Sequence, residues 1–175
     1  DVIFDISNPM QVKQAMSAIN QPIDIVINNA GIIGPDSPTT DMDWTAMAHT
    51  FAVNVAGALA VSTACLDHLR RSGSPRILTI SSQMSYMGYA KSDRISYRAS
   101  KAAVNKVMQG LATDLYPDGI SVVLVDPGWV QTDMGGAKAE LTPTEVAAGI
   151  IDLAERVTLE HTGKFFRWTG EERAF

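Results

Sequence analysis

Three short, largely apolar runs that each end in small or polar residues constrain the fold of this chain more than any other feature. They cover residues 23–27, 77–80 and 121–125, and they are followed by Asn-Asn-Ala-Gly, Ser-Ser and Asp-Pro-Gly-Trp. Longer segments with helical spacing separate them, which is typical of a parallel sheet covered by helices on both faces. Ligands bind at the carboxyl ends of the strands in such sheets, so these endings are candidates for one ligand site.

This alternation predicts one α/β domain in three layers over residues 1–175. We expect strands near 2–4, 23–27, 76–81, 121–125 and 164–167, and helices near 9–19, 43–70, 96–116 and 143–157.

Tyr97 and Lys101 stand four residues apart in a predicted helix, so they share one face. A phenol titrates near pH 10, and proton exchange at pH 7 needs a shift of about three pKa units, or about 4 kcal/mol. A nearby cation shifts the pKa of a phenol in that direction. A tyrosine and a lysine with this spacing are common on solvated helices. Whether Tyr97 and Lys101 are functional therefore depends on the other motifs in the chain.

Six short motifs follow one another in an order that resembles the short-chain dehydrogenase/reductase family. They are an acid after the first predicted strand (Asp5), Asn-Asn-Ala-Gly at 28–31, Asn-Val-Ala-Gly at 54–57, a serine at a strand end (Ser82), Tyr-x-x-x-Lys at 97–101 and Pro-Gly at 127–128. The segments 128–136 and 163–166 are most similar to the C-factor-like carbonyl reductase subgroup. The resemblance implies a doubly wound, Rossmann-like α/β fold and hydride transfer between NAD or NADP and a small carbonyl or alcohol substrate.

The resemblance also implies four catalytic residues. Tyr97 is the expected general acid in carbonyl reduction, and Lys101 lowers its pKa and binds the nicotinamide ribose. Ser82 donates a hydrogen bond to the substrate oxygen, although Ser81 or Ser85 could compete for this role. Asn54 is expected to interrupt its helix and to hold a water that links Lys101 to solvent.

Further residues are expected at the cofactor. Asp5 accepts from the adenine amino group, small residues let the backbone approach the adenosine ribose and pyrophosphate, and the 127–128 turn lies beneath the nicotinamide. The cofactor-binding residues implied in this way are Asp5, Ile6, Asn28, Ala30, Gly31, Tyr97, Lys101, Pro127, Gly128, Val130 and Thr132.

One part of the family pattern is missing from this sequence. A glycine-rich βα unit normally precedes the strand expected at 2–4 and receives the pyrophosphate. We therefore expect an N-terminally incomplete domain that lacks its first two strands, about 55–70 residues. The choice between NAD and NADP cannot be read without that unit. The strand at 2–4 then has no neighbour, and 23–27 is left as an open apolar edge.

Composition argues against several other classes of protein. The net charge is −5 and no basic cluster exceeds Arg70-Arg71, so we expect no nucleic-acid partner. No run of 18 or more apolar residues is present, so we expect no membrane span. The single cysteine, Cys65, fits a reducing compartment such as the cytoplasm. The three histidines are isolated, so we expect no metal site.

The sequence thus predicts an NAD(P)-dependent oxidoreductase, with a homo-oligomer formed through helices 43–70 and 96–116 implied by the resemblance. The short segment 133–141 indicates a shallow substrate pocket, lined by Met84, Tyr86, Met87, Tyr89, Trp129 and Met134. The alternative is a non-catalytic interaction or signalling protein, because the glycine-rich unit is needed for tight cofactor binding.

Overall fold

The computed structural model describes residues 2–175 as a five-stranded sheet with strand order β1-β2-β3-β4-β5. The first four strands run parallel, and β5 is antiparallel to β4. Val26 lies beside Ile77 in the register of the first pair, and Leu78 lies beside Val123 in the next. The strands are β1 (Ile25–Asn28), β2 (Arg76–Ile80), β3 (Ser121–Asp126), β4 (Phe165–Arg167) and β5 (Glu172–Arg173).

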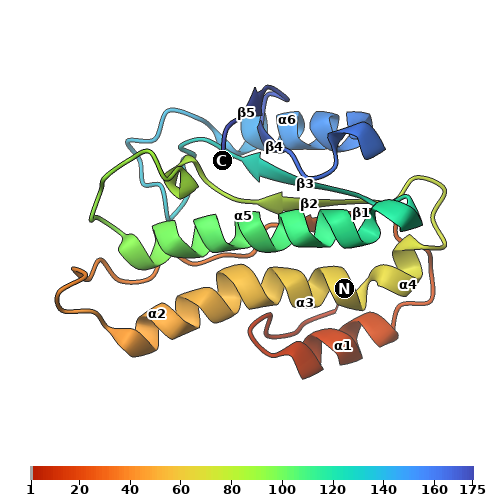
Figure 1. The fold of residues 1–175 in the computed structure, drawn as a ribbon, viewed down its shortest axis with the longest axis horizontal. Coiled ribbons are helices and arrows are strands. Elements are labelled where there is room, and N and C mark those ends of the chain that lie inside the picture. Colours follow the sequence, from red (N-terminus) through yellow and green to blue (C-terminus); the bar gives the residue numbers. More distant parts are fainter. Residues whose placement is uncertain (1) are drawn as a thin grey trace.

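Helices cover both faces of this sheet. In Figure 1, α6 lies above the strands, while α5, α3 and α1 follow one another below them. The α-helices are α1 (Pro9–Ser17), α2 (Trp44–Phe51), α3 (Ala58–Ala64), α4 (Leu66–Leu69), α5 (Ile95–Leu115) and α6 (Pro143–Arg156). A π-helix, η1 (Ala52–Gly57), joins α2 to α3, and short 3₁₀ turns occupy η2 (Gln83–Ser85), η3 (Tyr116–Asp118) and η4 (Leu159–His161).

The sheet buries both of its faces, as the apolar runs predict. Along β3, Val122 and Leu124 pack into the core beneath α1, α3 and α5, while Val123 and Val125 pack into the core beneath α6. All six residues of β3 are buried. Successive side chains of a strand point to opposite faces, so a central strand covered on both sides must be apolar at nearly every position.

Several predicted elements differ from the structure. Residues 2–4 form no strand, and no strand among residues 2–175 pairs with the outer edge of β1. A strand needs a hydrogen-bonding neighbour, and none of the five strands pairs with residues 2–4. β1 (Ile25–Asn28) is an edge strand of the sheet, so the open edge predicted at 23–27 is confirmed, and the Ile27 side chain on it is 42% exposed.

The predicted helix at 43–70 is divided into α2, η1, α3 and α4, with a break at Cys65. The strand predicted at 164–167 is β4, which covers Phe165–Arg167. The short strand β5 is not predicted by the sequence.

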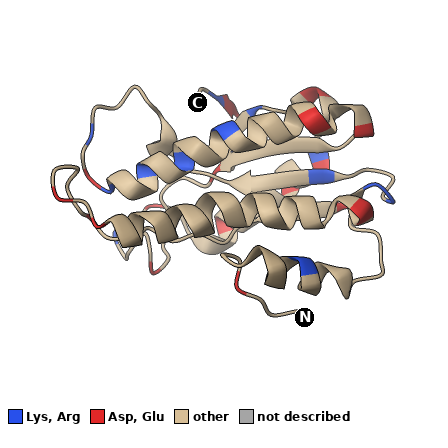
Figure 2. Cartoon of the chain, turned by 60° about the horizontal axis from the view of Figure 1, so that its bottom comes forward, with Lys and Arg blue, Asp and Glu red and all other residues tan. Residues whose placement is uncertain are grey.

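The rod formed by α2, η1 and α3 is unusually apolar. Residues Trp44–Ala64 contain an 18-residue stretch with a mean hydropathy of 1.3 and are long enough to cross a membrane, and the expectation that the chain has no membrane span stays a prediction. Figure 2 shows these helices in tan, because residues 44–64 contain no Lys, Arg, Asp or Glu. A third of this apolar stretch is buried against the rest of the chain. Core helices of soluble proteins can be equally long and apolar, so the hydropathy of these residues is weak evidence for a membrane span.

Candidate active site

Helix α5 carries Tyr97 and Lys101 to the carboxyl end of β2. Both side chains are buried, and Lys101 Nζ donates a hydrogen bond to the carbonyl of Ile80, the last residue of β2, at 2.7 Å. The same nitrogen lies 5.6 Å from the centroid of the Tyr97 ring. The four-residue spacing therefore brings phenol and amine to one face, as predicted.

Burial controls the pKa values of this pair. It lowers the pKa of Lys101 from 10.5 to about 8 and raises the pKa of Tyr97 above its usual value. Interaction with the Ser82 hydroxyl lowers the pKa of Tyr97, and the negative charge of Asp126 raises it, but both effects are smaller than burial. The sequence predicted that Lys101 makes Tyr97 more acidic. The net direction in this structure is the opposite, because removal from water disfavours the charged form of both groups.

Ser82 occupies the position expected for a substrate-binding hydroxyl. It caps η2, where its Oγ accepts a hydrogen bond from Met84 N at 3.1 Å. Ser81 Oγ donates to Asn105 Oδ1 at 2.5 Å, and Ser85 Oγ donates to the carbonyl of Ser82 at 2.7 Å. The two competing serines thus use their hydroxyl hydrogens within the protein, which favours Ser82 as the donor to a substrate.

Asn54 lies in the π-helix, so the predicted local interruption of its helix is confirmed. Its Nδ2 donates to Ile32 O at 2.8 Å and to Ser100 Oγ at 2.9 Å, and its Oδ1 accepts from Ile32 N at 2.8 Å. A Cβ placed on Gly31 would lie 3.3 Å from Asn54 Oδ1 and 3.5 Å from Lys101 Nζ. Asn54, Gly31 and Lys101 therefore converge at one point. The water expected between Asn54 and Lys101 stays a prediction.

Gly31, Ser82, Tyr97 and Lys101 line a cavity of about 810 Å³ at the carboxyl ends of the strands, whereas the buried Asn54 lies outside its lining. The turn at Pro127–Gly128 is part of the lining of this cavity, and Gly128 has a φ of 74° that favours glycine. The predicted residues that line the cavity are Gly31, Ser82, Met84, Tyr97, Lys101, Pro127, Gly128, Trp129, Val130, Thr132 and Met134. The space and the small residues beside Lys101 fit the nicotinamide half of a dinucleotide, so these residues could hold that half.

Other predicted residues lie outside the cavity lining. Asp5 accepts two hydrogen bonds from Ser7 instead, and Ile6 packs against Gly57 of the π-helix. Asn28 is buried and donates to Ser62 Oγ and Thr79 Oγ1, while its Oδ1 has no partner. The remaining predicted residues outside the lining are exposed: Ala30, Tyr86, Met87 and Tyr89.

Several side chains near the site were not predicted from the sequence. Asn105 stands four residues after Lys101, and this spacing could have indicated that it lies on the same face of the helix. Its Nδ2 donates to Ser85 Oγ at 2.9 Å. Arg98 lines the cavity and pairs with Asp93 at 3.0 Å. Asp126 ends β3 and is buried beside Gln83 and Gly128. Asn29 also lines the cavity.

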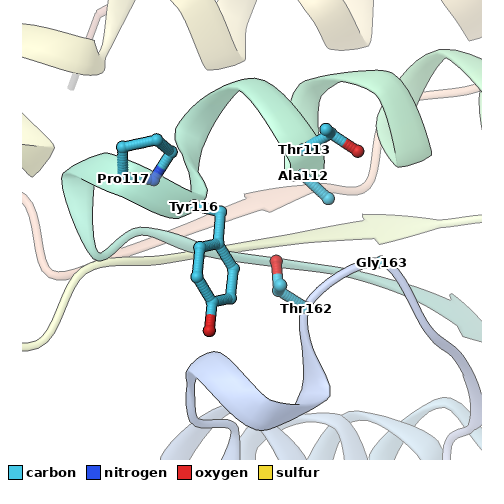
Figure 3. Close-up of a pocket in the computed structure, with 6 residues that line it drawn as sticks. All are labelled: Ala112, Thr113, Tyr116, Pro117, Thr162 and Gly163. Atoms are coloured by element: carbon cyan, nitrogen blue, oxygen red, sulfur yellow. The ribbon is translucent and has the colours of Figure 1, made fainter.

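A second, smaller hollow of about 340 Å³ lies at the other end of α5. Figure 3 shows it between the Tyr116 ring and the Thr162–Gly163 turn. Its lining contains no carboxylate, amine, imidazole or thiol, and the Tyr116 phenol has no such group beside it in the lining.

Comparisons with known proteins agree with this geometry. The family model for short chain dehydrogenase matches residues 2–142. C-signal of Myxococcus xanthus is 39% identical over 160 residues, which cover 90% of this chain and 96% of that protein. An NADPH-dependent aldehyde reductase-like chloroplastic protein of Arabidopsis thaliana is 36% identical over 135 residues, 74% of this chain and 49% of that protein.

Solved structures show the same similarity. Carbonyl reductase Sniffer of D. melanogaster superposes with a TM-score of 0.92 at 27% identity and covers 98% of this chain. NADPH-bound carbonyl reductase from chicken fatty liver gives a TM-score of 0.90 at 26% identity and covers 99% of this chain. This chain spans 76% of each of those chains.

Proposed function

Because the chain belongs to the short-chain dehydrogenase family, we propose that it acts as an NAD(P)-dependent oxidoreductase on a small carbonyl or alcohol substrate. One observation carries the proposal: Ser82, Tyr97 and Lys101 line a single cavity together with the Pro127–Gly128 turn, and Asn54 and Lys101 both approach Gly31 in its lining. The plant relative is named as NADPH-dependent and the chicken carbonyl reductase is NADPH-bound, which supports a dinucleotide of this class.

Each side chain has a role in the proposed reaction. The bound nicotinamide supplies or accepts the hydride. Tyr97 gives its phenolic proton to the substrate oxygen, and Ser82 donates a hydrogen bond to the same oxygen as negative charge develops there. Lys101 is fixed by its bond to Ile80 O and supplies positive charge beside the phenol. The raised pKa of Tyr97 keeps the phenol protonated near neutral pH, which suits the direction of carbonyl reduction.

The cavity lining favours an uncharged substrate. Apolar side chains such as Met84, Trp129 and Met134 face the space in front of Tyr97. Arg98 is the cation in this region besides Lys101, and its charge is paired with Asp93. An anionic substrate would have to compete with Asp93 for Arg98, so a neutral aldehyde or ketone fits best.

Cofactor titration and one substitution test the proposal. NADPH or NADH added to the protein should change nicotinamide fluorescence with saturation. Tyr97→Phe should leave this binding nearly unchanged and reduce kcat for aldehyde reduction to below about a tenth of wild type, because only the transferable proton is lost. Tyr116→Phe, an exposed tyrosine near the far end of α5, is the matched control and should keep full activity. A Tyr97→Phe variant with near-normal kcat would refute the general-acid role.

A non-catalytic interaction or signalling role is the second candidate. The match to C-signal favours it. The match covers 96% of C-signal, whereas it covers 49% of the plant relative. A folded chain that binds neither NADPH nor NADH would support this role over catalysis.

The proposal includes a cytoplasmic homo-oligomer without membrane or nucleic-acid partners. The buried free thiol of Cys65 is compatible with a reducing compartment. The uncharged rod of α2, η1 and α3 supports association with a second copy, since Trp44 on it is 74% exposed. Sedimentation velocity would test this, and a monomer at all concentrations would contradict it.

A further inference from the structure

A buried ion pair joins the last strand of the sheet to the residue that precedes the Pro127–Gly128 turn of the cavity lining. Arg173 on β5 binds Asp126, the last residue of β3, through Nη1 and Oδ2. The side chains are 15% and 6% exposed, so the pair is shielded from solvent. The guanidinium also lies over the Phe165 ring, with its carbon 5.1 Å from the ring centroid. A buried carboxylate is stable only when it is paired and hydrogen-bonded, and Arg173 is the charged partner of Asp126.

The second oxygen of Asp126 binds two backbone amides that belong to different walls of the site. Oδ1 accepts from Gln83 N at 3.0 Å and from Gly128 N at 3.1 Å. Gln83 follows Ser82, and Gly128 forms the turn expected beneath the nicotinamide. One carboxylate therefore connects the serine loop to the cofactor-side turn, and its two oxygens have separate partners.

We propose that Arg173 is a positioning residue for the active site: it fixes the orientation of Asp126, and Asp126 in turn fixes the Ser82 loop and the Pro127–Gly128 turn relative to each other. The role in catalysis rests on the proposed function, while the structural part does not. Arg173 itself lines no part of the cavity.

The contacts of Asp126 explain why its orientation depends on Arg173. With the guanidinium in place, Oδ2 is held toward β5, and Oδ1 is left facing the two amides. Without it, the carboxyl group loses its charge partner and can turn toward water. This change weakens an acceptor shared by two backbone donors.

Amide hydrogen exchange measured by NMR on Arg173→Met tests this without any cofactor. Exchange at Gln83 and Gly128 should become at least about tenfold faster, since these amides lose a charged acceptor. Exchange at Leu78 and Val123, in the centre of the sheet, should stay at the wild-type rate. Glu172→Gln is the matched control, because Glu172 is the neighbouring β5 residue and forms an exposed pair with Lys164. It should leave both site amides unchanged.

Arg173→Lys serves if Arg173→Met does not fold. Lysine keeps the charge without the planar fork, so exchange at Gln83 and Gly128 should lie between wild type and the tenfold increase. Wild-type exchange at both amides in a folded Arg173→Met variant, or in Arg173→Lys if only that variant folds, would overturn the proposal.

Activity measurements separate this proposal from the proposed function. In an active enzyme, Arg173→Met should reduce kcat more than it changes the Kd for NADPH, and Arg173→Lys should restore part of kcat. A wild-type protein without activity would contradict the proposed function and leave the exchange result standing. Normal kcat with fast amide exchange would show that the orientation of Asp126 does not govern catalysis.

Discussion

Replacing Lys101 by Met tests how strongly the fold opposes a charge at the centre of the site. Lys101 is 4% exposed, and its Nζ donates a hydrogen bond to Ile80 O at 2.7 Å. Burial lowers its pKa from 10.5 to about 8. Methionine has similar length and carries no charge, so the substitution removes the titration of this group from the folded and the unfolded chain alike.

The direction of the effect follows from the proton count. Between pH 8 and 10.5 the unfolded chain holds a proton at Lys101 that the folded chain has released, so the free energy of unfolding rises with pH. At about 1.36 kcal/mol per pKa unit the whole difference is about 3.4 kcal/mol, and about 1.4 kcal/mol of it develops between pH 7 and pH 9. Burial raises the pKa values of Cys65 and Tyr97, which oppose this rise at higher pH.

Urea unfolding of both proteins at pH 7, 8 and 9, followed by tryptophan fluorescence, measures this difference. The stability of Lys101→Met relative to wild type should fall by about 1.4 kcal/mol from pH 7 to pH 9. Comparison at equal pH cancels the contribution of Cys65. Lys106→Met, on an exposed part of the same helix, should show no such trend. A difference between Lys101→Met and wild type that is constant with pH would refute a lowered pKa at Lys101.

Three further substitutions test the local structure by urea unfolding. Asn54→Ala removes three hydrogen bonds of the π-helix and should cost about 3 kcal/mol; a loss below about 1 kcal/mol would mean that water replaces them. Gly128→Ala places a methyl group 2.6 Å from Leu141 Cδ1 at a φ of 74° and should cost about 1–3 kcal/mol, whereas unchanged stability would show that the turn adapts. Asn8→Ala removes the cap of α1 and should cost about 1 kcal/mol, and no loss would indicate that the helix end is already frayed.

The sequence predicted the central strands and the face of α5 because each depends on local spacing. β3 is covered on both sides and is therefore a continuous apolar run that stands out in the sequence. Tyr97, Lys101 and the carboxyl ends of β2 and β3 follow from helical spacing and from the parallel sheet. The local interruption of the helix at Asn54 was expected from the resemblance to the family and not from propensity, and the structure shows that it is a π-helix.

Other features depend on the tertiary fold and could not be predicted. β5 has two polar residues, so it has no apolar period to detect. The pKa of Tyr97 rises because of burial, which spacing along a helix does not report. Arg173 meets Asp126 across 47 residues of sequence, and the contact exists only because β4 and β5 return to the end of β3.

The π-helix also limits which insertions and deletions this chain can tolerate. Helix α2 packs against α5, whereas α3 packs mainly against α1 and β1. The extra residue of a π turn rotates one helical segment relative to the next, by about 100° per residue. Deleting a residue such as Ala56, even though its side chain is exposed, would turn α3 away from α1 and separate Ser62 from Asn28. A single-residue deletion here would therefore be more damaging than most substitutions at the same position.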